Sequence, residues 1–446
     1  MARSLMVVLL AATCFVAASC GGSDGGGDDG PATISFLIFG DPPELKAYRD
    51  IIAAYRKVDP DTTVKLIEAS DRDDLIARLS TSIAGGSPPD LFLLNYRYYG
   101  QFAAKGAREP LEERFAESEA FEEDDFFPEP LASFRWDGTL MCLPQNVSSL
   151  VVYYNRDLFK RFGVPEPRPN WTWLDFVRTA SALTRDENGM PIQGQDPDLP
   201  TTTGPVVRPA VYGAGIETIL IRLAPFAWSN GGDIVDDPER PTRLTLSDPN
   251  TLAALREFSA LRIPYGVIPT DNEVESEDDE TRFVNGRLAM LFDSRRAVPS
   301  LRAAAKFDWD VATLPRFKRP ASILHSDGYC MTKASKQKDA AWRFVEFALG
   351  PEGQEIVART GRTVPSIRAV AESRAFLDPR QKPRSSKVWL DAIEHVRPVP
   401  TISTWPEVED VVDGLIENGV YLGQPIDQVA AKADEQTREL FERAER

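Results

Sequence analysis

Residues 33–94 decide the fold, because short apolar runs alternate there with amphipathic helical patterns. The first run, TISFLIF at 33–39, is nearly continuous in apolar residues, as expected of a strand that is buried on both faces. Two helices and two further strands are predicted after it, at 44–58, 63–67, 71–84 and 91–94. Strands that alternate with helices predict a parallel sheet, so the expected fold class is α/β.

Polar side chains stand at the ends of these strands. Ligands of open α/β sheets bind at the carboxyl ends of the strands. Asp41 follows the first predicted strand, and Asn95, Tyr96 and Arg97 follow the third. These four are candidate ligand-binding residues, although Asp41 and Arg97 could instead cap helices or form surface ion pairs.

The remainder of the chain continues with both kinds of element. A hairpin turn at 136–139 is followed by predicted strands at 140–144, 150–154, 288–292 and 328–332. Helices are predicted at 172–183, 252–261, 338–349, 408–418 and 426–443, and another begins at 155. Residues 271–280 hold seven acidic residues in ten, and we expect a solvated loop because the regular aspartate spacing of a calcium loop is missing.

Composition argues against several classes of protein. The net charge of −17 argues against a nucleic-acid-binding protein, which needs a basic face to neutralise phosphate. The only histidines are His325 and His395, and they form neither an HExxH metal motif nor a cysteine–histidine pair. We therefore expect no catalytic residues, no metal and no cofactor.

The amino end has the features of an export signal. Arg3 precedes an apolar run at 5–18. As a helix this run would rise about 21 Å, which is too short for a hydrocarbon core of roughly 30 Å. A positive charge, a short apolar run and small residues predict a signal peptide at 1–19.

The residues around Cys20 suggest a membrane anchor. The sequence AASC at 17–20 resembles a bacterial lipobox, which implies lipidation of Cys20 and a location on the extracytoplasmic face of the cell membrane. The alternative is a plain signal peptide with a chance cysteine. Residues 21–30 contain only glycine, aspartate and serine, so 20–31 is expected to be a flexible tether.

Seven motifs, in this order along the chain, resemble those of bacterial extracellular solute-binding proteins of the maltose-binding type. They lie at 85–91, 136–144, 152–159, 171–176, 283–290, 341–347 and 351–354. Each motif is weak alone, but seven in the family's order cover almost the whole exported chain. Residues 201–209 and 271–280 look like insertions relative to that family.

The resemblance implies a periplasmic-binding-protein type II fold, in which two discontinuous α/β lobes enclose a ligand cleft. The implied first lobe is 32–144 plus 330–376, the second is 147–327 plus 383–446, and the hinge segments lie near 145–146, 328–329 and 377–382. If the first two hinge segments run side by side, Cys142 and Cys330 come close together. They could then form a disulfide, or they could remain two separate buried thiols.

The resemblance also implies candidate ligand-binding residues in the cleft. They are Gln145, Asn146 and Asp327 at the hinge, Trp228, Asn230 and Gly231 in a loop, Asp293 and Arg295 after a strand, and Trp405 near the carboxyl end. An aromatic ring could pack against the apolar face of a sugar, but a tryptophan is more often a core residue.

The implied function is capture of a carbohydrate and its delivery to the permease of an ABC importer. A small solute, permease subunits and a membrane reached through the lipid anchor are the expected partners, and the chain is expected to be a monomer that binds no nucleic acid. The alternatives are a cell-surface polysaccharide hydrolase and a sensory binding protein.

Overall fold

The computed structural model describes residues 31–192 and 208–445. The expected signal peptide at 1–19, Cys20, the tether up to residue 30 and residues 201–207 lie outside the described residues. Residues 32–446 form one compact unit. Among the described residues, every helix is too short or too polar to cross a bilayer.

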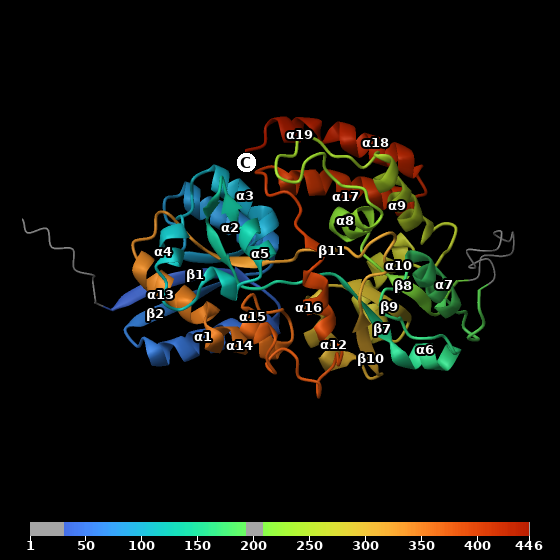
Figure 1. Cartoon of the computed structure of the whole chain (residues 1–446), viewed down its shortest axis with the longest axis horizontal. Coiled ribbons are helices and arrows are strands. Elements are labelled where there is room, and N and C mark those ends of the chain that lie inside the picture. The colour runs from blue at the N-terminus through green and yellow to red at the C-terminus, as the bar shows by residue number, and fades with distance from the viewer. Residues whose placement is uncertain (1–30, 193–207, 446) are drawn as a thin grey trace, which may run out of the picture. The chain divides into compact units, whose positions relative to one another are not determined.

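A five-stranded sheet forms the first half of this unit (Figure 1), and its strand order is β2-β1-β3-β12-β6. Its strands are β1 (Ala32–Phe39), β2 (Thr62–Ala69), β3 (Leu91–Asn95), β6 (Cys142–Pro144) and β12 (Asp327–Met331). The first three strands pair in parallel, as their alternation with helices predicts. The other two strands are added antiparallel.

Helices cover this first sheet. They are α1 (Pro42–Val58), α2 (Arg72–Ala84), α3 (Tyr96–Ala104), α4 (Glu112–Ala116), α5 (Pro128–Ser133), α13 (Lys338–Leu349), α14 (Pro351–Thr360) and α15 (Arg368–Ala371), with η1 at Glu123–Asp125. Segments distant in sequence share one core, because the Phe344 ring of α13 packs against Phe36 at 5.7 Å and Tyr55 at 5.3 Å. A hairpin of β4 (Arg135–Trp136) and β5 (Thr139–Leu140) turns through Asp137 and Gly138, both with positive φ.

A four-stranded sheet forms the second half, in the order β10-β7-β9-β8. Its strands are β7 (Val151–Asn155), β8 (Tyr212–Gly215), β9 (Leu288–Asp293) and β10 (Trp309–Ala312). The helices of this half are α6 (Arg156–Phe162), α7 (Trp173–Leu183), α8 (Leu220–Ser229), α9 (Pro249–Ala260), α10 (Asp271–Ser276), α11 (Asp279–Val284), α12 (Val298–Ala304), α16 (Lys387–Ile393), α17 (Trp405–Tyr421), α18 (Ile426–Gln436) and α19 (Arg438–Glu442), with η2 at Arg295–Ala297.

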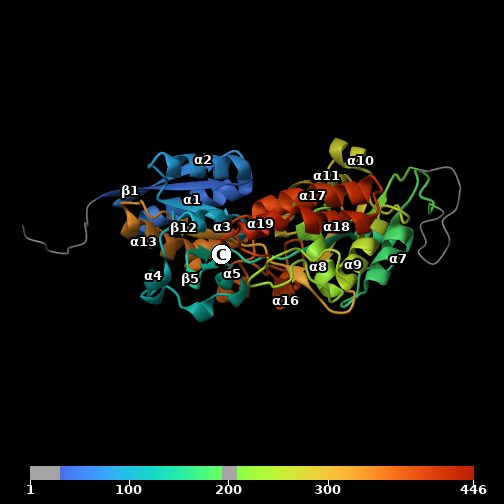
Figure 2. The ribbon, with the colours of Figure 1, turned by 90° about the horizontal axis from the view of Figure 1, so that it is seen from above.

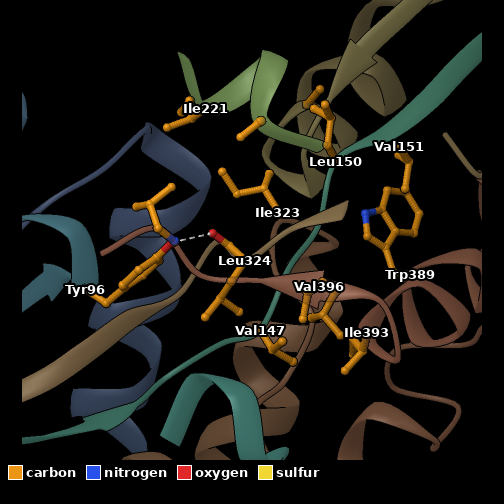
Figure 3. Packing of buried hydrophobic residues seen from close by; sticks show 14 of the residues in the cluster. Tyr96, Val147, Leu150, Val151, Ile221, Ile323, Leu324, Trp389, Ile393 and Val396 are labelled. Carbon is orange, nitrogen blue, oxygen red and sulfur yellow. Dashed lines mark hydrogen bonds between the residues drawn. The ribbon is translucent and has the colours of Figure 1, made fainter. Parts of the chain in front are cut away.

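Connecting segments run side by side between the two sheets (Figure 3). Ser148 and His325 exchange backbone hydrogen bonds of 2.8 and 2.9 Å, and β11 (Ser322–Ile323) pairs in parallel with β13 (Val396–Arg397). The Tyr96 hydroxyl donates to the Leu324 carbonyl at 3.2 Å. These pairings hold the connections together at the edge of the first sheet.

Cys142 and Cys330 are opposite one another in the antiparallel pair of β6 and β12. The two cysteines are joined by a disulfide. Both are fully buried. The bond therefore links the strands that lead into two of the connecting segments.

The acidic segment 271–280 is helical, so the prediction of a solvated loop is wrong. Thr270 caps α10, because its side chain and that of Glu273 bond each other's backbone N–H groups. Glu273 is buried and also accepts hydrogen bonds from Tyr212 at 2.7 Å and Arg208 at 2.6 Å. Asp278 caps α11 through the Thr281 N–H. Capping and one inward carboxylate therefore order a segment whose composition alone suggested a loop.

Candidate functional site

A cavity of about 700 Å³ lies between the two sheets, and residues of both halves line it. This volume is in the usual range for small-molecule sites. The lining residues are mostly polar or charged, and its only aromatic residues besides His325 are Phe39 and Tyr98. The cavity wall is therefore mainly polar.

A triad of amides and a carboxylate belongs to this lining. The Asn95 amide donates to one carboxylate oxygen of Asp327 at 3.2 Å, and the Asn146 amide donates to the other at 3.2 Å. Asn95 ends β3, Asp327 begins β12, and Asn146 lies between β6 and β7. The ends of two strands and one connecting segment thus meet at one carboxylate.

Two helices from different halves meet beside the cavity. Helix α17 packs against α8 and α9 and also reaches α3 (Figures 1 and 2). There Arg97 Nη1 lies 2.6 Å from Glu409 Oε2, and the Trp405 indole donates to Glu409 Oε1 at 2.7 Å. The Glu409 carboxylate is therefore fixed by one partner from each half.

Arg222 organises the second half of the lining. Its guanidinium lies 2.5 Å from Glu217 and 3.4 Å from Asp293, and a third nitrogen contacts His325 Nε2 at 3.2 Å. Burial, and then the charge of Arg222, holds the pKa of His325 well below its usual range. His325 is thus neutral at pH 7, and its Nε2 accepts the hydrogen bond from Arg222.

Arg362 and Glu44 form a buried ion pair on the first half. Arg362 Nε lies 2.6 Å from Glu44, and Nη1 lies 3.1 Å from Asp41. Burial raises the pKa of Glu44 to about 7, and the charge of Arg362 only partly opposes it. Asp41 also accepts a hydrogen bond from the Glu44 N–H at the start of α1, so it has the capping role considered from the sequence.

Three polar atoms in the lining have no partner among the described residues. Ser148 Oγ and Thr363 Oγ1 are buried and without a hydrogen bond, and so is Arg72 Nε. Both hydroxyl residues are only 7% exposed. A buried polar group without a partner costs free energy, so these atoms mark where a ligand with hydrogen-bonding groups would be stabilised.

The cavity shows no sign of a metal site. Within residues 31–192 and 208–445, no three histidine, cysteine, aspartate or glutamate residues are arranged to hold a metal ion.

Comparison with known families identifies the chain. The family model for bacterial extracellular solute-binding proteins matches residues 50–382. The chain is a bacterial extracellular solute-binding protein. A maltooligosaccharide ABC transporter solute-binding lipoprotein of Streptococcus pneumoniae (strain ATCC BAA-255 / R6) is 22% identical to it over 421 residues, which cover 93% of this chain and 91% of that protein.

Solved structures share the fold of this solute-binding protein. An ABC substrate-binding protein from Listeria monocytogenes in complex with cycloalternan has a TM-score of 0.81 at 23% identity, over 92% of this chain and 99% of that chain. UgpB from Mycobacterium tuberculosis in complex with glycerophosphocholine has a TM-score of 0.76 at 22% identity, over 92% and 98%. The fold is the type II periplasmic-binding-protein fold with two α/β lobes, as the resemblance implied.

Four of the sequence-predicted ligand-binding residues of this solute-binding protein line the cavity: Asn95, Arg97, Asn146 and Asp327. Nine do not: Asp41, Tyr96, Gln145, Trp228, Asn230, Gly231, Asp293, Arg295 and Trp405. Three of these nine residues, Asp293, Tyr96 and Gln145, form hydrogen bonds or ion pairs with residues of the lining or of the connecting segments. Asp293 bonds Arg222, and the Tyr96 hydroxyl bonds backbone groups of Leu324 and Val399. The Gln145 side chain accepts from the Asn146 amide at 2.7 Å.

The two tryptophans expected in the cleft belong to the core. Trp228 is 1% exposed, its indole donates to Asp233 at 2.9 Å, and the Arg397 guanidinium covers its ring. Trp405 is 0% exposed, with its indole bonded to Glu409. Neither ring has a free face for a ligand, because protein groups surround both.

Three further predicted residues lie elsewhere. The Arg295 guanidinium is buried between Phe376 at 4.1 Å and Trp389 at 4.5 Å. The Asn230 amide donates to the Asn250 carbonyl. Gly231 lines a separate cavity of about 450 Å³.

Sequence analysis missed Arg72, Glu217, Arg222 and Arg296, all of which line the cavity. A signal for them existed. Arg72 follows β2, a parallel strand like those before Asp41 and Asn95, so the same rule of strand ends applies to it. Glu217 and Arg222 similarly follow β8.

Proposed function

We propose that this protein is the extracytoplasmic solute-binding component of an ABC importer and that it captures a mono- or oligosaccharide. The observation that carries the proposal is the cavity of about 700 Å³ with unpartnered hydroxyl groups at Ser148 and Thr363. Sugar hydroxyls both donate and accept, so they would satisfy these groups together with the carboxylate and amides around Asp327. The relative from Streptococcus pneumoniae, named for maltooligosaccharides, supports this class of ligand.

The anchor and the hinge complete the proposal. Lipidation of Cys20 would tether the chain to the membrane beside its permease, which ATP-hydrolysing subunits would drive. The lobes proposed are 32–144 plus 330–376 and 147–327 plus 383–446, with hinge segments near 145–146, 328–329 and 377–382. A solute that contacts both lobes binds best when they enclose it, and this differential affinity would shift the population toward the enclosed form.

No reaction on the solute is proposed. Two carboxyl groups of the lining, those of Glu44 and Asp413, have pKa values raised to about 7, mainly by burial, as a general acid of a hydrolase would. Both are engaged by other groups, however, because Glu44 pairs with Arg362 and Asp413 accepts the Leu220 N–H at 2.7 Å. We expect the purified protein to release no reducing sugar from polysaccharides, and robust release would contradict a purely binding role.

A thermal-shift screen against mono- and oligosaccharides, followed by calorimetry of the hits, tests the proposal. A bound solute raises the melting temperature by mass action. The variant Asp327→Ala should weaken binding about 10-fold to 100-fold, because it removes a charged hydrogen-bond acceptor. The matched control is Arg243→Gln, which alters the 450 Å³ cavity and should bind as the wild type does. Failure of every carbohydrate to bind would overturn the proposed ligand class.

A further inference from the structure

The charges that line the cavity do not balance. Four of its guanidinium groups are paired with carboxylates, in the pairs Arg97–Glu409, Arg222–Glu217, Arg296–Asp293 and Arg362–Glu44. Besides Asp327, which accepts hydrogen bonds from two amides, three carboxylates of the lining form no ion pair within the described part of the chain, those of Asp73, Asp410 and Asp413. One guanidinium, that of Arg72, likewise lacks a carboxylate partner there. Even with Asp327 left aside, three unpaired carboxylates against one unpaired guanidinium leave an excess of negative charge.

The three carboxylates come from both halves. Asp73 lies in the first turn of α2, while Asp410 and Asp413 lie three residues apart on α17 and so on one face of that helix. Burial, then the charges of Glu409 and Asp73, raises the pKa of Asp410. Because Asp73 and Asp410 line the same cavity, the two halves present like charges to it.

Asp413 is partly buried, whereas Asp73 and Asp410 are exposed. The only hydrogen bond of Asp413 in the described residues is from the Leu220 N–H. Burial raises the pKa of Asp413 to about 7, and the nearby charges of Glu409 and Asp410 add to the effect. A cation placed here would relieve both the burial cost and the repulsion.

The unpaired Arg72 guanidinium does not neutralise the excess negative charge of the cavity. It lies 5.1 Å from the Tyr98 ring centroid and 5.9 Å from that of Phe39, and it donates to the Tyr98 hydroxyl at 3.2 Å. Aromatic faces and a hydroxyl therefore already stabilise its charge in part. They also leave its buried Nε free to donate to a ligand oxygen.

A second, independent observation points to a ligand in the same cavity. Ser148 and Thr363 are each 7% exposed, line the cavity and have hydroxyl groups without a partner among the described residues. The two hydroxyl groups lack hydrogen-bonding partners, and the unpaired carboxylates would be stabilised by a cation. One solute with both kinds of group would satisfy all of them.

We propose that the solute is an amino sugar or an amino-sugar oligosaccharide, whose protonated amine is bound by Asp410 and Asp413 with Asp73 facing it from the other lobe. This inference rests on the proposed function and specifies its substrate class. An ammonium donates three N–H bonds, and charge-assisted hydrogen bonds to carboxylates are shorter and stronger than neutral ones.

Calorimetry with paired probes tests the inference. The cationic probes are D-glucosamine and its β-1,4-linked disaccharide and trisaccharide, the neutral probes are the N-acetylated forms and D-glucose, and spermidine serves as an amine without a sugar. At pH 7 the cationic sugars should bind at least about 10-fold more tightly than their acetylated counterparts, the factor expected of a charged hydrogen bond. The double variant Asp410→Asn/Asp413→Asn should abolish that difference. Glu417→Gln, an exposed acidic residue on the same helix, should retain it.

The outcomes separate the two proposals. Neutral sugars that bind as tightly as cationic ones, or cationic probes that do not bind at all, would overturn the inference. In the first of these cases the carbohydrate proposal stands. Spermidine binding without binding of any sugar would overturn both the inference and the carbohydrate proposal. A preference for cationic sugars that survives in the double variant would also overturn the inference, because other groups would then hold the amine.

Discussion

Arg97 of α3 and Glu409 of α17 form an ion pair with 2.6 Å between Nη1 and Oε2, and both side chains are only 6% exposed. The pair connects helices of the two halves and lies in the wall of the cavity. The Trp405 indole holds the second oxygen of the same carboxylate. The same ion pair therefore both stabilises the contact between the two halves and fixes part of the cavity wall.

Replacing only one residue of this ion pair should lower the free energy of unfolding. Arg97→Met leaves a buried carboxylate without its cation, and we expect a loss of about 3–5 kcal/mol in the free energy of unfolding. The double variant Arg97→Met/Glu409→Gln removes the charge while it keeps an acceptor for the Trp405 indole, so it should lose less than the single variant. Urea unfolding measures both, and a double variant at least as unstable as the single one would contradict this account.

The variant Trp405→Ala should lower the stability of the fold. Its ring is completely buried, so truncation should cost about 3–5 kcal/mol through lost packing and an unfilled cavity. Trp228→Ala should behave in the same way. Thermal unfolding gives the loss of stability, and calorimetry on the folded fraction gives the affinity. An unchanged melting temperature with weakened binding would place these rings at the ligand instead of in the core.

The sequence could predict the order and type of most elements, because apolar periodicity and helix caps act locally. Strands, helices and the turn at Asp137 and Gly138 lie within a few residues of the predicted bounds. The helix predicted over 426–443 divides into α18 and α19 at Thr437. The loop predicted at 271–280 is wrong because Glu273 is stabilised by hydrogen bonds from Tyr212 and Arg208. These residues are distant in sequence and come together only in the folded structure.

The candidate site was predictable from strand ends and from the family resemblance. Asn95 and Arg97 follow from the rule of strand ends, and Asn146 and Asp327 follow from the hinge positions that the resemblance implies. The resemblance predicts Arg295 in the cavity, but the next residue, Arg296, lines it instead. The alternation of side chains along β9 does not fix the side-chain direction of residues beyond its end at Asp293. Trp405 was named because of an aromatic position in the family, but its burial depends on Glu409 and Arg97, which meet only in three dimensions.

Asp279 should make stability depend on pH. Burial raises the pKa of Asp279 from 3.8 to about 7, and its Oδ1 is buried without a hydrogen bond among the described residues. The folded state thus binds a proton that the unfolded state has lost between about pH 4 and pH 7. The contribution of this group to stability is complete below about pH 4 and is lost as the pH rises toward 7.

The variant Asp279→Asn isolates this effect, because its side chain cannot ionise. At pH 5 the variant should be only slightly more stable than the wild type, because only part of the contribution of Asp279 is lost there, and at pH 8 the advantage of the variant should be larger. Urea unfolding at both values tests the sign. A difference between the two proteins that is the same at pH 5 and pH 8 would show that Asp279 does not titrate in this range.

The disulfide should contribute to stability. Cys142 and Cys330 are 188 residues apart, and removal of a native disulfide typically costs about 2–5 kcal/mol because the unfolded chain regains freedom. Cys142→Ala/Cys330→Ala should unfold at lower urea concentration than the wild type, and a reducing agent should affect only the wild type. Peptide mapping without reductant should recover the two cysteines in one linked fragment, and separate fragments would contradict the bond.

The most direct test of the central claim is a crystal structure of the protein with its solute bound. We predict one solute molecule in the cavity of about 700 Å³, with hydrogen bonds to the Ser148 and Thr363 hydroxyl groups and to the carboxylate of Asp327. A solute found instead in the 450 Å³ cavity beside Gly231, or on the surface away from both lobes, would contradict the account.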